Sequence, residues 1–259
     1  MKKIITSLFI YKSQLYSSTL DGNITQQNIN TNYKNDGIEF NVNNHFEHTI
    51  VLDIKAYKDH LYILTRDGLY KYFDSRIDKI KNISDAQVIT IDQKLKILFI
   101  ISDSRGLIGL NLKNDNYIDD IEIELFNNGD SQVPITSITA HNGIIFLSIL
   151  NSGIYRIDYK SKKSKFVYKQ MQKIELKNPQ ELYYNKKNDE LAIVDFDYGL
   201  ILIKLENGNT SNYNLPNMDI PNSIKYINSF DRKYYVIQAR NALYKFNIKN
   251  NKTLLQYVL

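Results

Sequence analysis

The stretch LAIVDFDYGLILIKL, from Leu191 to Leu205, contains two apolar runs separated by a short turn with Asp195, Asp197 and Gly199. Short runs rich in β-branched residues, joined through Asp and Gly, predict two antiparallel strands connected by a tight turn. The segment therefore predicts a β-hairpin, and the same pattern can be sought in the rest of the chain.

Five further segments have the same order of apolar run, turn and apolar run, and they begin at Gln14, Leu61, Leu98, Ile145 and Tyr234. Measured between the turn glycines, or at Ala242 in the sixth copy, successive copies are 46, 38, 47, 46 and 43 residues apart. This spacing, with strands of period two, is typical of β-propeller blades and not of helical repeats.

The repeat predicts an all-β fold, a single six-bladed β-propeller with four antiparallel strands per blade. All 259 residues are expected to form this one domain, with blades at about 1–44, 45–84, 85–131, 132–176, 177–217 and 218–259. In the fourth copy the strands are expected at 135–140, 143–150, 153–159 and 165–171. No strand is left over to lace the first blade to the last, so packing between blades must close the ring.

The composition agrees with a globular protein and excludes several classes of site. Apolar residues make up 43% of the 259 residues and charged residues 24%, which argues against disorder. The absence of Cys excludes disulfides, thiolate nucleophiles and iron–sulfur clusters. Lys12 interrupts the first apolar run, so neither a signal peptide nor a membrane span is expected. The cytoplasm is the default location and the periplasm the alternative.

The unit from Leu191 to Leu205 resembles the bacterial LVIVD and WD40- or YVTN-like β-propeller repeat superfamily, whose blades read as apolar strand, Asp or Asn with Gly, and apolar strand. The likeness extends over all six copies at the level of the fold. It implies the propeller architecture, and because propellers carry many unrelated functions it implies no particular activity.

Acidic residues gather in the turns between the second and third strands. If these turns converge, they could hold a metal or a small ligand at the mouth of a central channel. The alternative interpretation is that Asp is simply favourable in turns. The candidate ligand or metal residues are Asp67, Asp103, Asp195, Asp197 and Arg240.

Basic residues gather in the turns at the other end of the strands, between strands one and two and between strands three and four. Mixed with aromatic residues, they could bind a partner, although a solvated hairpin tip has the same composition. The candidate partner-binding residues are Lys160, Lys162, Lys163, Lys165, Lys186 and Lys187.

The leading functional hypothesis is a non-enzymatic interaction scaffold, or an accessory or maturation factor, that binds a protein partner through one disc face. The alternative is an enzyme or a small-ligand or metal binder with its site at the acidic mouth of the channel. A third hypothesis is binding of nucleic acid or another anionic surface to the lysine-rich face, which the scarcity of Arg disfavours. The sequence contains none of the usual catalytic motifs, and no cofactor is expected. A monomer is expected.

Overall fold

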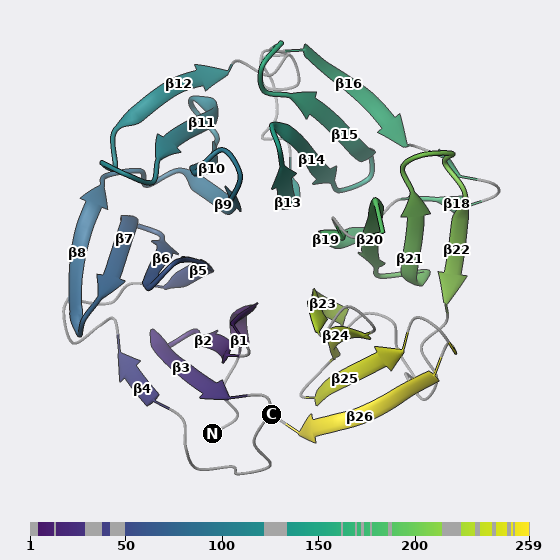
Figure 1. Cartoon of the computed structure of the whole chain (residues 1–259), viewed down its shortest axis with the longest axis horizontal. Helices are drawn as coiled ribbons and strands as arrows, with labels where there is room; N and C mark the ends of the chain where they lie inside the picture. The colour runs from purple at the N-terminus through teal and green to yellow at the C-terminus, as the bar shows by residue number, and fades with distance from the viewer. Residues whose placement is uncertain are drawn as a thin grey trace. The chain divides into compact units, whose positions relative to one another are not determined.

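The computed structural model describes most of the chain, namely residues 5–12, 14–28, 38–41, 50–121, 134–161, 163–168, 170–171, 174–176, 178–185, 188–213, 224–230, 234–239, 242–247, 250 and 252–258. These residues form β-strands and the turns between them (Figure 1). Within these ranges, no helix has the length and apolar character needed to cross a membrane.

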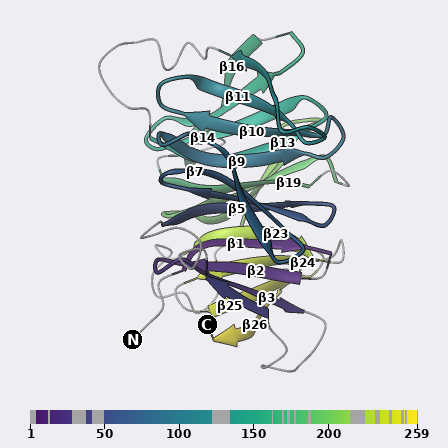
Figure 2. The same ribbon diagram turned by 90° about the vertical axis from the view of Figure 1, so that its left-hand side faces the viewer.

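The chain divides into two compact units, Met1–Asn127 and Asn128–Leu259, which we call unit 1 and unit 2. Unit 1 contains three four-stranded antiparallel sheets in which each strand pairs with the next one along the chain. The first sheet has β1 (Ile5–Tyr11), β2 (Gln14–Thr19), β3 (Asn23–Asn28) and β4 (Ile38–Asn41). The second has β5 (Val51–Tyr57), β6 (His60–Thr65), β7 (Gly68–Phe73) and β8 (Arg76–Lys81). The third has β9 (Ala86–Asp92), β10 (Ile97–Ser102), β11 (Gly106–Asn111) and β12 (Tyr117–Ile121). Figure 2 shows β1, β2 and β3 side by side.

Unit 2 also contains three four-stranded sheets with the same up-and-down order. They are formed by β13 (Ile135–His141), β14 (Ile144–Ile149), β15 (Gly153–Asp158) and β16 (Lys163–Tyr168), by β19 (Pro179–Asn185), β20 (Glu190–Asp195), β21 (Gly199–Lys204) and β22 (Thr210–Tyr213), and by β23 (Ile224–Phe230), β24 (Tyr234–Ala239), β25 (Ala242–Asn247) and β26 (Lys252–Val258). Two short strands, β17 (Gln170–Met171) and β18 (Ile174–Glu175), pair separately.

The core lies between neighbouring sheets of each unit, and the middle strands of several sheets are apolar on both faces. Every residue of β10 is buried, and so is every residue of β20. The fourth strands are more polar: β8 (RIDKIK) is largely exposed. Sheets with buried middle strands and polar outer strands are the blades of a β-propeller.

The all-β fold with a β-propeller arrangement and the four antiparallel strands expected in each large sheet are confirmed, whereas the predicted single six-bladed propeller is corrected to two compact units with an additional small sheet. Two findings require this correction. The sheet formed by β17 and β18 lies outside any four-stranded repeat, and the chain separates into two units of three four-stranded sheets each. The outer strand expected at 165–171 lies instead at Lys163–Tyr168, because Tyr168 pairs with Ile154 and the residues after it turn away to pair with β18.

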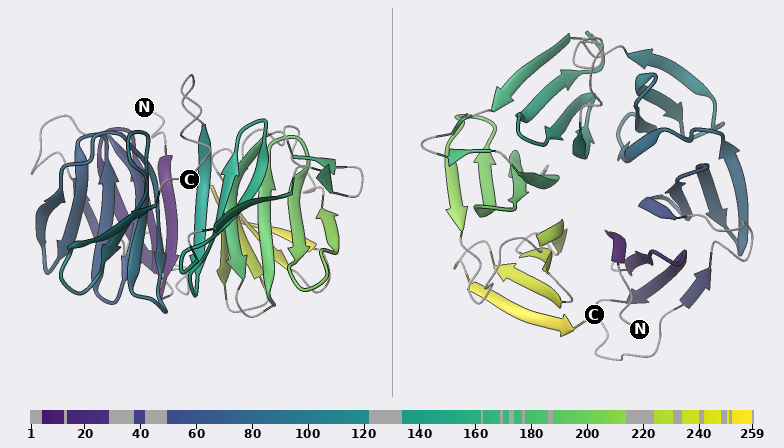
Figure 3. Two further views of the ribbon diagram at one scale, coloured as in Figure 1. Left: turned by 90° about the horizontal axis from the view of Figure 1, so that it is seen from above. Right: turned by 180° about the vertical axis from the view of Figure 1, so that it is seen from behind.

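The first strand of every four-stranded sheet has the same irregularity. Its pairing with the second strand skips the residue at position two, which is Thr6, Leu52, Gln87, Thr136, Gln180 or Lys225. A register shift of this kind redirects the side chains around it. Figure 3 shows, in a side view, strands that end in turns at both ends.

Candidate interaction surface

The acidic residue of the β6–β7 turn is engaged within its own hairpin. Asp67 accepts hydrogen bonds from the hydroxyls of Thr65 and Tyr70, and Lys79 Nζ lies 3.3 Å from its Oδ2. Burial of the Tyr70 ring, together with the hydrogen bond to Asp67, raises the pKa of Tyr70. Asp67 therefore fixes the turn and holds the outer strand against it.

The β10–β11 turn of the third sheet is held by two acids. Asp103, a predicted site residue, accepts a hydrogen bond from the side-chain amide of Gln87. Asp85 was not predicted as a site residue, and it accepts hydrogen bonds from Ser102 Oγ and from the Ser104 N–H, both at 2.8 Å. Burial opposes ionisation of Asp85, but these hydrogen bonds outweigh it and lower the pKa of the carboxyl.

In unit 2, Asp195 and Asp197 both contribute to the β20–β21 turn. Asp195 Oδ1 accepts the backbone N–H groups of Asp197 at 2.8 Å and Tyr198 at 3.1 Å. Asp197 Oδ2 in turn accepts a hydrogen bond of 2.7 Å from the Asn178 side chain. Asp195 is fully buried, and its burial raises the pKa of the carboxyl. Arg240 lies outside the described residues.

In these contacts, each described residue of the predicted acidic site forms hydrogen bonds within its own sheet or turn. Asp67 and Asp103 lie in different sheets of unit 1, each bonded to neighbours of its own turn or strand. Asp195 and Asp197 share one turn of unit 2, linked through the Asp197 N–H. In the described part of the chain, no three His, Cys, Asp or Glu residues are grouped so that they could hold a metal ion.

The predicted basic residues of unit 2 are described only in part. Lys160 is exposed in the β15–β16 turn, where its N–H donates to Asp158 Oδ1 at 3.1 Å. Lys163 is exposed at the first position of β16, opposite Asp158. Lys165 lies in β16 opposite Arg156, but its side chain is outside the described part of the structure. Lys162, Lys186 and Lys187 lie outside the described residues.

In unit 1, more of the residues in the corresponding turns are described. We define its basic end as the end where first strands meet second strands and third strands meet fourth strands. The described turns there carry five exposed lysines, Lys12, Lys58, Lys94, Lys96 and Lys113. They carry three aspartates, of which Asp59 pairs with Lys12 at 3.3 Å and Asp115 pairs with Lys71 at 2.8 Å. The basic end therefore has an excess of positive charge.

Aromatic residues cross the second sheet at this end. Tyr57 pairs with His60 across β5 and β6, the His60 and Phe73 rings stack with centroids 4.5 Å apart, and Phe73 pairs with Arg76 across β7 and β8. Directly paired residues of antiparallel strands share one face of the sheet. We call these four residues the aromatic ladder, which runs from the first strand to the fourth.

An ion pair lies beside the aromatic ladder, and the Phe73 ring of the ladder is partly exposed to solvent. Lys71 of β7 forms an ion pair with Asp115 of the third sheet, and each side chain is about one-fifth exposed, at 21% and 22%. Burial, together with the charge of Lys71, lowers the pKa of His60, so the imidazole is neutral at pH 7. Phe73 is 47% exposed, and the Lys58 ammonium lies 5.7 Å from the centroid of the Tyr57 ring. The ladder thus presents neutral rings beside exposed cations.

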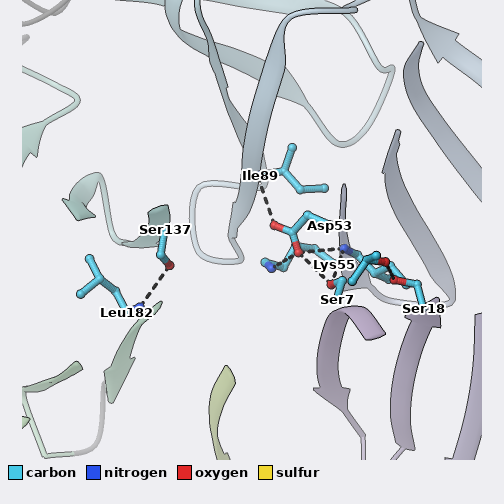
Figure 4. Close-up of polar contacts among 9 residues, drawn as sticks. Ser7, Ser18, Asp53, Lys55, Ile89, Ser137 and Leu182 are labelled. Atoms are coloured by element: carbon cyan, nitrogen blue, oxygen red, sulfur yellow. Dashed lines mark hydrogen bonds and ion pairs between the residues drawn. The ribbon is translucent and has the colours of Figure 1, made fainter. Parts of the chain in front are cut away.

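The sequence analysis missed a polar junction between the first strands of unit 1, which Figure 4 shows. Asp53 Oδ1 accepts hydrogen bonds from Ser7 Oγ at 3.2 Å and from Lys55 Nζ at 2.6 Å, and Asp53 Oδ2 accepts the Ile89 N–H at 3.3 Å. The Ile54 N–H also donates to Asp53 Oδ1 at 2.8 Å. With both oxygens occupied, Asp53 joins three sheets.

Two sequence signals could have revealed this junction. Lys55 lies two residues after Asp53, so both side chains share one strand face. The triplet Ile-Thr-Ser occurs at residues 5–7 and again at residues 135–137, in both cases at the register shift of a first strand.

Comparison with known proteins supports the fold. Over 98% of this chain, the structure is similar to an extracellular domain assigned to a one component system of B. thetaiotaomicron, with TM-score 0.70 and 16% identity. A structure of an extracellular domain assigned to a hybrid two component system of B. thetaiotaomicron gives TM-score 0.67 and 14% identity over 99% of this chain. A computationally designed protein, Ika8, gives TM-score 0.60 and 12% identity over 98% of this chain and 86% of its own.

The two B. thetaiotaomicron structures are of the same extracellular domain, and the chain spans only 36% and 37% of them. No protein-family model matches the chain, and no curated protein matches its sequence. At these identities the similarity concerns the fold alone, and the fold is that of a β-propeller.

Proposed function

We propose that this protein is a non-enzymatic binding module that engages a protein partner through the turns between first and second strands and between third and fourth strands. The observation that carries the proposal is the basic end of unit 1, where exposed lysines lie in the turns at the same end of the strands as the partly exposed Phe73. Aromatic residues with adjacent cations are the groups that most often dominate the affinity of protein interfaces.

The rigidity of the sheets supports the same proposal. The turns of the basic end begin and end on strands that are hydrogen-bonded in register, as in the pairing of Tyr57 with His60. A backbone held in this way loses little conformational freedom when a partner binds, which favours affinity. In unit 2 the exposed Lys160 and Lys163 occupy the equivalent turn of their own sheet, and we propose this turn as a second binding surface, separate from that of unit 1.

The two structures from B. thetaiotaomicron are of the extracellular domain of one protein, which is assigned to a signalling system. This description supports a location outside the cytoplasm for the present protein, in place of the cytoplasmic default. We therefore include export in the proposal. Fractionation of the native host, with detection by an antibody against this protein, tests the location directly.

Affinity capture from the native host tests the binding proposal. The tagged wild type is compared with Lys58→Glu/Lys113→Glu in unit 1 and with Lys160→Glu/Lys163→Glu in unit 2. The control is Arg66→Glu, because Arg66 is exposed in the β6–β7 turn at the opposite end of the second sheet. We expect a stoichiometric protein that the wild type and the control retain and at least one double variant loses. Retention of every captured protein by both double variants would contradict the proposal.

A further inference from the structure

Phe73 is one of four large hydrophobic residues that are exposed in the described part of the chain, together with Leu20, Tyr117 and Ile118. The Tyr117 ring is already in contact with two cations, since Lys81 Nζ and Arg105 Cζ lie 4.7 and 4.5 Å from its centroid. Phe73 instead stacks on the neutral ring of His60 and stays 47% exposed. It is therefore an exposed apolar ring supported by a second ring.

The charges beside Phe73 indicate what would cover it. Arg76 is paired with Phe73 across the β7–β8 turn, and Lys58 lies at the other side of the aromatic ladder. The neighbouring turns of the third sheet add Lys94, Lys96 and Lys113. The Lys71–Asp115 ion pair joins the second sheet to the β11–β12 turn, which carries Lys113, and the Leu112 N–H donates to the Lys96 carbonyl of the β9–β10 turn at 3.0 Å.

Two exposed aspartates, Asp59 and Asp74, directly adjoin the ladder in the sequence. A nucleic acid backbone carries the same negative charge at every step and would be repelled by both. A protein segment can match a surface of mixed charge and still carry net negative charge. The charge pattern therefore favours an acidic protein segment over nucleic acid.

We infer that the aromatic ladder is the docking site for an acidic segment of a protein partner, which places an apolar side chain against Phe73 and its carboxylates beside Arg76 and Lys58. This inference rests on the proposed function and names the chemistry of the partner. Apolar contact with Phe73 supplies affinity, because aromatic anchors at the centre of an interface carry much of its binding energy. The lysines at the rim accelerate encounter with an acidic partner and exclude basic ones.

Fluorescence anisotropy with defined probes tests the inference. The probes are a labelled random copolymer of glutamate and tyrosine, labelled polyglutamate of the same length and a labelled single-stranded oligothymidylate. The full chain is compared with Phe73→Ala and Arg76→Glu. The matched controls are Leu20→Ala, an equally exposed apolar residue in the β2–β3 turn, and Arg66→Glu, an exposed arginine in the β6–β7 turn.

We expect the glutamate–tyrosine copolymer to bind the wild type more tightly than polyglutamate does. Phe73→Ala and Arg76→Glu should each weaken that binding by about tenfold or more, whereas both controls should bind as the wild type does. The far-ultraviolet circular dichroism of each variant should match that of the wild type. Unchanged copolymer affinity in both ladder variants, no copolymer binding to the wild type, or tighter ladder-dependent binding of oligothymidylate would each overturn the inference.

The capture experiment separates this inference from the proposed function. If a captured partner is retained by Phe73→Ala and lost by Lys58→Glu/Lys113→Glu, the partner binds the basic end outside the aromatic ladder, and only the docking inference fails. If no captured protein depends on either double variant, the proposed function fails as well.

Discussion

The hydroxyl of Ser137 accepts a hydrogen bond of 3.1 Å from the backbone N–H of Leu182, and this bond joins the first strands of two neighbouring sheets in unit 2. Ser7 makes the same contact with the Ile54 N–H at 3.2 Å in unit 1. In each case the serine follows a register shift in its strand. The shift thus supplies a serine side-chain acceptor to a backbone N–H group of the neighbouring sheet.

The first prediction concerns this contact. Ser137→Ala should lower the free energy of unfolding by about 1–3 kcal/mol, because the buried N–H of Leu182 loses its acceptor. Urea denaturation followed by circular dichroism measures the change, and Ser211→Ala in the exposed part of β22 is the control. A loss no larger than that of the control would show that the contact contributes nothing to stability.

The second prediction concerns the ion pair between Asp53 and Lys55, whose side chains are 13% and 15% exposed. Asp53→Asn should destabilise the protein by about 1–3 kcal/mol, because Lys55 then keeps its charge in a mostly buried place without a counter-ion. Adding Lys55→Met should recover part of the loss, since the second change removes the uncompensated charge. Unfolding free energies of the two single variants and the double variant measure the coupling. If the losses of the two single variants simply add in the double variant, the ion pair contributes no coupling energy to stability.

Sequence patterns predict the second and third strands well because these strands are short, apolar and joined by Asp-Gly or similar turns. The six expected hairpin segments all form paired strands, as Leu191–Ile203 and the other register pairs show. The outer strands are harder to predict because polar, half-exposed residues leave the register weakly determined. No apolar alternation in the sequence predicts the pairing of Tyr168 with Ile154 or the small sheet of β17 and β18.

The candidate surface was predictable only in part. The alternation of turns predicts lysines at one end of the strands, and the described turns of unit 1 carry Lys58 and Lys113 as exposed residues there. The aromatic ladder could not be predicted, because it depends on the register that brings His60 against Phe73. The acidic turns contain the expected residues, but hydrogen bonds such as that from Tyr70 to Asp67 depend on side-chain geometry that composition does not specify.

The third prediction concerns Gly68, which has a φ of +154° at the start of β7. A Cβ atom here would collide with the backbone carbonyl of Lys81 and the side chain of Lys79. Because the carbonyl cannot move without disturbing β8, Gly68→Ala should destabilise the protein by about 2 kcal/mol or more. Gly208→Ala is the matched control, since Gly208 has a φ of +72° and no atom within 4 Å of such a Cβ. Thermal or urea unfolding should show a clearly larger loss for Gly68→Ala.

The fourth prediction concerns Asp85, whose pKa is lowered because hydrogen bonds from Ser104 and Ser102 outweigh the cost of burial. A lowered pKa in the folded state contributes stability above the ordinary value of 3.8, and this contribution is lost as the pH falls through the folded-state pKa. Asp85→Asn should therefore be less stable than the wild type at pH 6 by about 1 kcal/mol. The difference should shrink as the pH is lowered below about 4. A difference independent of pH would contradict the assigned ionisation.

The fifth prediction concerns Asp195, whose pKa is shifted in the direction opposite to that of Asp85. The Asp195 carboxyl is fully buried, its Oδ2 has no hydrogen-bond partner among the residues that the structure describes, and burial raises its pKa. A raised pKa means that the folded state holds the proton more tightly than the unfolded state does. Its favourable contribution is therefore complete below the ordinary value of 3.8 and is lost as the pH rises through the folded-state pKa.

Asp195→Asn removes the charge and keeps an oxygen that can accept the N–H groups of Asp197 and Tyr198. The stability of this variant relative to the wild type should therefore increase as the pH rises from 4 to 8, because only the wild type must ionise a buried carboxyl. Urea midpoints of both proteins, measured at intervals over that range, give the slope. A relative stability that stays constant or falls with pH would mean that Asp195 ionises as easily in the folded protein as in the unfolded chain.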